Sequence, residues 1–288
     1  MTIQSDAPLF VAELSADDDR RYDPHALLTL LRTFAVVVLR GMALTPVQQV
    51  ELTRGLGEPQ LDPDTYNRHP DNPELLVVDN SGDTPVVGNN IWHTDGSFLR
   101  QPIRYTMLRA VVLPTSGGDT LYADLQTAYE NMTPQWRDVL AGAIGLHAYD
   151  RIAAMRADAH HNPAALAGSS TYTPVRHPII RAHPDTGAPV LFVNDLCLAR
   201  IESDDGAPIE LTVADLIAHA TQDQFVYRHR WAAGDVVVWD NARALHRSDF
   251  TAALSRVMHR TTTSGDIPQP FTSLGGVSDG SGNQARPT

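Results

Sequence analysis

A histidine and an aspartate flank one threonine in the segment NNIWHTDGSF, residues 89–98. On a β-strand, side chains two positions apart point to the same face, so a strand here would project His93 and Asp95 together and turn Thr94 away. A neutral imidazole and a carboxylate are two of the three ligands in the facial Fe(II) site built from two histidines and one carboxylate. Because the chain holds 12 histidines, the pair can arise by chance. The interpretation therefore needs a second histidine and a cosubstrate site.

The second histidine candidate is His246, in the segment GDVVVWDNARALHRSDF. A strand of buried type, 236–239, runs into a turn at Asp240-Asn241, and His246 follows. About 150 residues separate His246 from Asp95, so only the fold can bring them together. Three protein ligands on one face of an octahedral ion leave three positions open, enough for a bidentate 2-oxo acid and dioxygen.

An anion site is predicted from the segment RVMHRTT, residues 256–262. On a strand, Arg256 and Arg260 lie on the same face. A buried arginine needs an anion, and its planar fork suits a carboxylate, as in a dicarboxylate cosubstrate. The Gly-Gly turn of SGGDTLYADL offers the Thr120 hydroxyl as a further donor, although this hydroxyl could also simply cap the turn.

Composition excludes several other functions. The formal net charge is -12, so no electrostatic footprint for nucleic acid is present. All 22 basic residues are arginine, which excludes lysine Schiff-base chemistry. The single cysteine, Cys197, forms no internal disulfide, and no signal or membrane-spanning segment is visible. We expect a cytoplasmic protein that acts on a small molecule, binds no membrane, and forms a homo-oligomer, either a dimer or a tetramer.

Helix caps and short apolar runs indicate the fold class. Asp or Thr followed by Pro, or a capping box, predicts helices starting near 24, 46, 134 and 213. Runs rich in valine and aromatic residues predict strands over 35–41, 74–80, 104–113, 189–195, 225–231, 235–241 and 256–264. The strands come in groups, which favours a mainly β barrel or jelly roll with helical insertions. We expect a single domain over 1–271 and a disordered Gly/Ser-rich tail over 272–288.

Two loops have the length and composition to carry substrate specificity, 61–70 and 155–176. The second contains Asn-Pro, Gly-Ser-Ser and Thr-Pro and shows no clean period, so we expect an irregular lid over the site. His160-His161 within it could suggest a second metal site, but a solvated loop explains the pair more simply.

In chain order, six segments resemble the TauD/TfdA family of Fe(II)- and 2-oxoglutarate-dependent dioxygenases: NNIWHTDGSF, LPTSGGDTLYADLQTAYE, HPIIRAHPDTGAPVLFVN, FVYRHRWAAGDVVVWDN, LHR and RVMHRTT. The resemblance runs from about Val36 to Gly265. It implies a double-stranded β-helix (a jelly roll of the cupin type) and the use of Fe(II), 2-oxoglutarate and O2. The implied reaction oxidises a C–H bond of a small, anionic molecule and releases succinate and CO2. Hydroxylation, C–X bond cleavage and desaturation in a biosynthetic pathway all remain open.

The resemblance also implies roles for individual residues. The iron ligands would be His93, Asp95 and His246. Thr120 and Arg256 would hold the far carboxylate of 2-oxoglutarate, and Arg260 would lie near its keto-acid end and near the substrate. The residues that would face the substrate from neighbouring loops are Asn89, Tyr66 and His69, although Asn89 could be only a turn residue.

The sequence departs from the family pattern in three places. The part before Val36 is short, which leaves the N-terminal edge of the sheet in doubt. Asp62 lies where taurine dioxygenase uses a histidine to contact the sulfonate, so taurine is not the expected substrate. The lysines that help to hold aryloxyalkanoate acids in the related branch are absent.

Two functions of other classes stay open at this point. A cupin-like hydrolase or isomerase would use the same ligands with Zn or Mn, but it has no use for a carboxylate clamp of Arg256 and Thr120. A non-catalytic binding protein could retain the fold, although an intact ligand triad argues against it. Binding of 2-oxoglutarate separates these functions from a dioxygenase.

Overall fold

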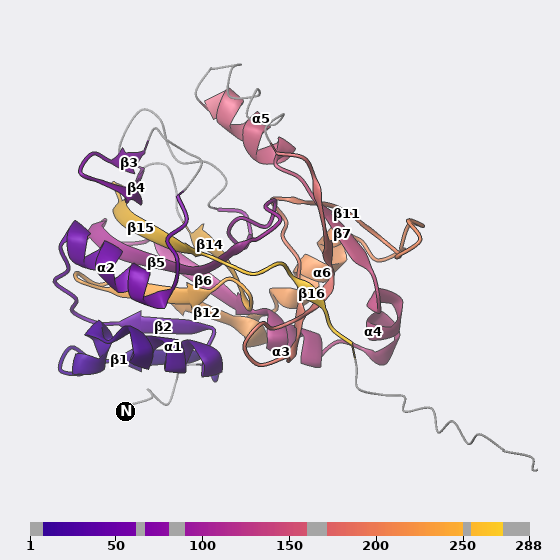
Figure 1. Ribbon diagram of the computed structural model, residues 1–288, viewed down its shortest axis with the longest axis horizontal. Coiled ribbons are helices and arrows are strands. Elements are labelled where there is room, and N and C mark those ends of the chain that lie inside the picture. Colours follow the sequence, from indigo (N-terminus) through magenta and orange to yellow (C-terminus); the bar gives the residue numbers. More distant parts are fainter. Residues whose placement is uncertain (1–7, 62–66, 81–89, 160–171, 250–254, 273–288) are drawn as a thin grey trace, which may run out of the picture.

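The computed structural model describes residues 8–61, 67–80, 90–159, 172–249 and 255–272, with the backbone alone for 156–159 (Figure 1). The strands are β1 (Val11–Leu14), β2 (Val36–Leu39), β3 (Arg68–His69), β4 (Asn72–Asp79), β5 (Ile103–Val112), β6 (Asp119–Asp124), β7 (Ile144–His147), β8 (Val175–Pro178), β9 (Ile180–Ala182), β10 (Pro189–Leu191), β11 (Leu198–Glu202), β12 (Val226–His229), β13 (Val236–Asp240), β14 (Ala244–Asp249), β15 (Val257–Ser264) and β16 (Gln269–Pro270). The helices are α1 (Pro24–Thr33), α2 (Pro46–Leu56), α3 (Leu125–Glu130), α4 (Pro134–Leu140), α5 (Asp150–Ala159) and α6 (Val213–Ala220), with short 3-10 turns η1 (Asp19–Tyr22) and η3 (Asp223–Phe225).

Two sheets enclose the part of the molecule where the predicted ligands lie. The larger sheet has the order β1-β2-β13-β5-β15-β4-β3, and the smaller has the order β12-β6-β14. One apolar cluster joins them, since Tyr122 and Ala244 of the smaller sheet pack with Trp239, Leu108 and Met258 of the larger. The predicted mainly β architecture is therefore present, with a core between two facing sheets.

The central strands of the larger sheet are buried on both faces, which explains their continuous apolar runs. In β13, Val237 and Trp239 point to the core between the sheets, while Val236 and Val238 point outward. Helices α1 and α2 cover this outer face (Figure 1). Gly55 allows the two helices to approach, because a Cβ at this position would lie 2.4 Å from Pro24 Cγ.

The predicted helix caps are confirmed. Asp23 and Thr133 cap α1 and α4, and capping boxes start α2 at Thr45 and α6 at Thr212. Helix α2 ends at Leu56 with Gly57 as its C-cap, whereas Gly55 belongs to the helix itself. Two helices were not predicted, α3 and α5. The latter covers 150–159, so the start of the segment expected to be irregular is helical, and 160–171 lie outside the described residues.

The N-terminal edge of the larger sheet is complete despite the short leading segment. Strand β1 pairs parallel with β2, with Val11 opposite Val36. On the other side of the molecule, two three-stranded sheets, β11-β7-β8 and β10-β9-β16, pack with α3, α4 and α6 around a second apolar cluster (Figure 1). The predicted tail, 272–288, lies outside the described residues apart from Thr272. The single domain over 1–271 stays a prediction.

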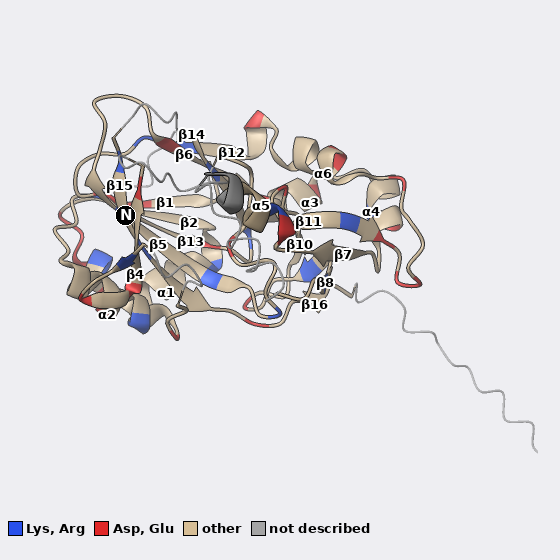
Figure 2. Cartoon of the chain, turned by 90° about the horizontal axis from the view of Figure 1, so that it is seen from above, with Lys and Arg blue, Asp and Glu red and all other residues tan. Residues whose placement is uncertain are grey.

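Charged residues are dispersed over the molecule rather than gathered on one element (Figure 2). In the described part of the chain, no helix combines the length and apolar character that a membrane crossing requires.

Candidate active site

The two predicted histidine ligands face each other across an isolated antiparallel bridge beside β14. His93 N donates to His246 O at 2.9 Å, and His246 N donates to His93 O at 2.8 Å. The expectation of a regular strand at His93-Thr94-Asp95 is wrong, because His93 forms only this bridge and Asp95 already begins a turn. The His93 Nδ1 lies 2.7 Å from Ile91 O, and a carbonyl can only accept. Nδ1 therefore carries the proton, and the Nε2 lone pair is available for a metal.

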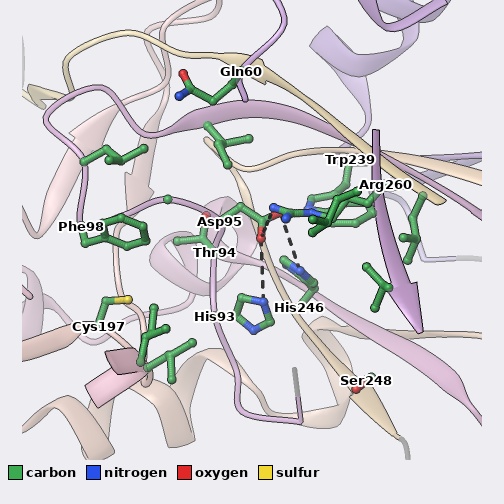
Figure 3. Close-up of a pocket in the computed structure, with 18 of the residues that line it drawn as sticks. Gln60, His93, Thr94, Asp95, Phe98, Cys197, Trp239, His246, Ser248 and Arg260 are labelled. Carbon is green, nitrogen blue, oxygen red and sulfur yellow. Dashed lines mark ion pairs between the residues drawn. The ribbon is translucent and has the colours of Figure 1, made fainter. Parts of the chain in front are cut away.

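The turn brings the aspartate beside both imidazoles. Gly96 has a φ of 65°, and a Cβ there would lie 3.2 Å from Ile103 N, so both the conformation and the space favour glycine. Asp95 Oδ1 is 3.9 Å from His93 Nε2, and Asp95 Oδ2 is 3.9 Å from His246 Nε2. The three ligand atoms lie within 4.8 Å of one another. The side chains thus converge although they are not on one regular strand (Figure 3).

The electrostatics of this group suit a divalent cation. Burial lowers the pKa of His93, and it lowers the pKa of His246 to about 3, so both imidazoles are neutral near pH 7. Burial alone would raise the pKa of Asp95, but Arg260 and the two imidazoles hold it well below its usual range. The site therefore offers two neutral nitrogens and one carboxylate without first releasing a proton, a set of donors that would suit Fe(II).

Two neighbours hold the Asp95 carboxylate. Arg260 Nη2 lies 2.9 Å from Oδ1, and the Thr106 hydroxyl donates to Oδ2 at 2.7 Å. Arg260 is on the cavity wall, as its predicted place near the cosubstrate and substrate requires, but its ion pair with Asp95 was not foreseen.

The predicted carboxylate clamp is assembled next to the triad. Arg256 Nη2 donates to Thr120 Oγ1 at 3.2 Å, and both residues line the same cavity as the ligands. Thr120 is the second residue of β6 rather than part of the Gly-Gly turn. The turn has its own role: Gly118 has a φ of 76°, and a Cβ there would lie 3.4 Å from Arg256 Cδ.

The clamp has the properties of a site for an anion. Arg256 is 3% exposed, its Nε has no partner, and no carboxylate of the described residues forms an ion pair with it. Burial lowers its pKa to about 10, because the charged guanidinium is desolvated and no counterion among the described residues offsets that cost. Thr120 Oγ1 also accepts from Trp231 Nε1 at 3.0 Å, so with two bonds accepted the hydroxyl can make a further bond only as a donor. These residues fit the far carboxylate of 2-oxoglutarate.

Besides the triad and the clamp, the cavity of about 140 Å³ has a mainly apolar wall. This apolar wall comprises Phe98, Leu99, Ile103, Tyr149, Ile152, Leu196 and Cys197. In Figure 3, Phe98 and Cys197 lie on one side of Asp95, whereas Trp239 and Arg260 lie on the other. Phe98 and Tyr149 pack with ring centroids 4.7 Å apart, so part of the apolar wall is aromatic.

The remaining predicted site residues have mixed outcomes. Asn89 and Tyr66 lie outside the described residues, as do His160 and His161. His69 was expected to face the substrate, but it belongs to β3 and its ring packs edge-on against His259, at 5.6 Å, instead of lining the cavity.

Two groups of the site were not found from the sequence. Thr106 on β5 contacts the carboxylate of Asp95. Asn241, which follows β13, contacts the backbone N–H of Asp95. Two features of the sequence could have indicated them. Thr106 occupies a position of β5 whose side chain points inward, and the polar pair Asp240-Asn241 directly follows an apolar strand.

Comparisons with known proteins agree with this geometry. Residues 5–262 match the family model described as "Taurine catabolism dioxygenase TauD, TfdA family". The chain belongs to this family. Within the TauD/TfdA family, it is 34% identical over 252 residues to the alpha-ketoglutarate-dependent 2,4-dichlorophenoxyacetate dioxygenase of Burkholderia sp. (strain RASC), covering 80% of this chain and 82% of the relative. The enzyme of the same name from Cupriavidus pinatubonensis is 32% identical over 282 residues, covering 90% and 96%.

A solved structure of the same type supports the fold. The crystal structure of AAD-2 in complex with Mn(II) and N-oxalylglycine superposes with a TM-score of 0.72 at 25% identity, covering 92% of this chain and 96% of that chain. This TauD/TfdA protein thus has the predicted jelly-roll core. It is an Fe(II)- and 2-oxoglutarate-dependent dioxygenase, which sets aside the hydrolase, isomerase and non-catalytic alternatives.

Proposed function

We propose that His93, Asp95 and His246 hold the iron, and that Arg256 and Thr120 hold the far carboxylate of 2-oxoglutarate. With dioxygen, the bound iron and cosubstrate supply the oxidation of a substrate C–H bond, with release of succinate and CO2. Trp239 packs against His246, with ring centroids 4.7 Å apart, and helps to exclude water from this side of the triad. The observation that carries the proposal is the buried Arg256, which has no acidic partner in the described chain and opens onto the same cavity as three converging metal ligands.

The apolar wall of the cavity supports a proposal for the substrate. Seven of its lining residues are apolar, aromatic or thiol-bearing, and Arg260 provides a guanidinium beside the triad. We propose a small molecule with one anionic group, directed at Arg260, and an apolar body that packs against Phe98, Tyr149 and Leu196. Aryloxyalkanoate acids have this form, and two relatives are named for one of them.

The supply of cations limits the charge of the substrate. The chain has no lysine, and the segments 62–66, 81–89 and 160–171 contain no arginine. Arg256 and Arg260 are the arginines that line the described cavity, and Arg256 is assigned to the cosubstrate. Among the side chains that the structure describes, a substrate with two strongly anionic groups would find a guanidinium for only one of them, and an unpaired charge is costly in a buried site.

A substrate panel tests this proposal. The protein with Fe(II), 2-oxoglutarate and O2 is supplied with an aryloxyacetic acid, the methyl ester of that acid, an alkyl sulfate ester or taurine, and succinate and oxidised product are measured. We expect coupled turnover with the aryloxy acid, much less with its uncharged ester, and little with taurine, which lacks an apolar body. Preference for taurine, or equal turnover of the acid and its ester, would contradict the proposed substrate class.

A pair of leucine variants separates substrate contacts from general stability. Leu196→Ala removes apolar atoms from the cavity wall, and a loss of about 1 to 2 kcal/mol would raise the substrate KM by roughly tenfold. Leu191→Ala is the matched control, because Leu191 is fully buried in the cluster around α3, α4 and α6 and does not line the cavity. We expect the control to lower the free energy of unfolding and to leave KM unchanged.

We further propose that the protein is a cytoplasmic homo-oligomer, a dimer or a tetramer. Sedimentation equilibrium of the purified chain tests the oligomeric part, and a monomer at all concentrations would refute it.

A further inference from the structure

The aspartate ligand lies in a part of the chain that no strand ladder fixes. Asp95 follows the isolated bridge at His93, and its backbone N–H donates to a side chain, Asn241 Oδ1, at 3.1 Å. The Thr94 hydroxyl donates to the backbone carbonyl of the same asparagine at 3.0 Å. Because the backbone conformation sets the direction in which Asp95 points, Asn241 controls one determinant of its position.

Asn241 also reaches the carboxylate itself through one intermediate. Its Nδ2 donates to Thr106 Oγ1 at 2.8 Å, and Thr106 Oγ1 in turn donates to Asp95 Oδ2 at 2.7 Å. An amide nitrogen can only donate, so Thr106 accepts from Asn241 and directs its single hydrogen at the carboxylate. The direction of this relay is therefore determined.

The orientation of the Asn241 amide is also determined. Oδ1 faces two donors, Asp95 N and Trp239 Nε1, the latter at 3.0 Å. Nδ2 faces the Thr106 hydroxyl and the Arg104 carbonyl, the latter at 3.4 Å. A flipped amide would place donor against donor on one side. Asn241 is 1% exposed, so water does not compete for these contacts.

The backbone of Asn241 is held from both sides. Its N–H donates to Arg104 O at 2.8 Å, and its carbonyl accepts from Arg181 Nη2 at 2.7 Å. The asparagine is thus tied to β5 and β9 and provides a rigid reference for the turn that carries Asp95.

We infer that Asn241 is a positioning residue that orients the Asp95 carboxylate. Its Oδ1 holds the Asp95 backbone N–H, and its Nδ2 holds the Thr106 hydroxyl that donates to the carboxylate. The inference rests on the proposed role of Asp95 as a metal ligand. Hydrogen bonds to metal-binding carboxylates orient them, and loss of such a bond typically weakens metal binding by about ten- to a hundredfold.

The test compares Fe(II) affinity and stability among threonine and asparagine variants. Thr106→Val keeps the shape and removes the hydroxyl, and Thr106→Ser restores it. The matched control is Thr261→Val: Thr261 is also buried in the larger sheet, but its hydroxyl contacts the hydroxyl of Thr53 in α2, 2.6 Å away. Fe(II) binding is titrated anaerobically without 2-oxoglutarate, and the melting temperature of each metal-free protein is recorded.

We expect Thr106→Val to weaken Fe(II) binding by about ten- to a hundredfold while its metal-free melting temperature matches that of Thr261→Val. Thr106→Ser and Thr261→Val should bind Fe(II) as the unaltered chain does. Asn241→Asp replaces the Nδ2 donor with an acceptor, so the Thr106 hydrogen turns away from Asp95. It should weaken binding to a similar degree, and adding Thr106→Val should then cause little further loss.

Each outcome has a distinct meaning. If Thr106→Val and Asn241→Asp bind Fe(II) as tightly as Thr261→Val does, the positioning role is wrong, whereas the metal site stands. If the unaltered chain does not bind Fe(II), the proposed metal ligands fail as well. Should Asn241→Asp not fold, the comparison of Thr106→Val with Thr261→Val still decides whether the Thr106 hydroxyl positions the Asp95 carboxylate.

Discussion

Replacement of Arg256 by alanine should weaken 2-oxoglutarate binding more than any other single change in the clamp. The guanidinium is 3% exposed, touches Thr120 and has no carboxylate partner among the described residues, so under the proposed assignment 2-oxoglutarate would supply its only strong anion. Loss of a desolvated bidentate contact to a carboxylate costs about 2 to 4 kcal/mol. At about 1.4 kcal/mol per tenfold, the Kd should rise by roughly thirtyfold to a thousandfold. Arg256→Lys should recover only part of this loss, because a point charge cannot reproduce the planar fork.

The assay is calorimetric titration of 2-oxoglutarate into the protein with Mn(II), which avoids turnover. Arg109→Ala is the matched control: Arg109 lies in the same sheet and is half-buried with the neutral partners Gln49 and His259, but it faces away from the cavity. We expect the control to bind 2-oxoglutarate with unchanged Kd. A Kd for Arg256→Ala within about threefold of the control would place Arg256 outside the cosubstrate site and refute the assignment of the clamp.

Three further predictions concern the clamp and one buried histidine, His177. Thr120→Val should raise the Kd of 2-oxoglutarate by roughly five- to tenfold, since one hydrogen bond to a charged group is lost, and equal affinity in the same titration would show that the hydroxyl does not contact the cosubstrate. Gly118→Ala should lower the free energy of unfolding by about 1 kcal/mol, because alanine is strained at the φ of 76° found here. It should also weaken 2-oxoglutarate binding, because the added Cβ crowds Arg256. Unfolding curves and calorimetry would have to show both effects. Burial lowers the pKa of His177 to about 4, below the value of about 6.5 in the unfolded chain, so the unfolded state binds more protons between these values and stability falls as the pH drops through this window. The loss attributable to this residue should reach about 2 kcal/mol near pH 5, and His177→Gln should show a correspondingly smaller difference between denaturation curves at about pH 7 and pH 5; an identical pH dependence would contradict this attribution.

The sequence predicts those features that depend on local chemistry. The caps at Asp23, Thr45 and Thr212 are side-chain contacts within four residues, and the structure confirms them. The apolar runs of β2 and β13 report burial on both faces of the larger sheet. The ligand candidates were also accessible, since residue type and spacing alone suggest a facial metal site.

Features that arise from contacts between distant segments could not be predicted in this way. Asp95 contacts Asn241 across 146 residues, and nothing near either residue records that pairing. The strand expected at His93 reduces to a single bridge, because its geometry is set by His246 and not by the local pattern. Helix α5 begins at Asp150 without a cap signal and was missed for that reason. The ion pair of Arg260 with Asp95 likewise depends on the closure of the two sheets.

The most direct test of the central claim is the visible spectrum of the protein with Fe(II) and 2-oxoglutarate under anaerobic conditions. If His93, Asp95 and His246 hold the iron and leave adjacent positions open, the keto acid chelates it and a weak charge-transfer band appears. We predict this band for the unaltered chain, with saturation at stoichiometric Fe(II). His246→Ala should lack the band, and it should also fail to form succinate on exposure to air. A band of unchanged strength in His246→Ala, or its absence from the unaltered chain, would contradict the proposed metal centre.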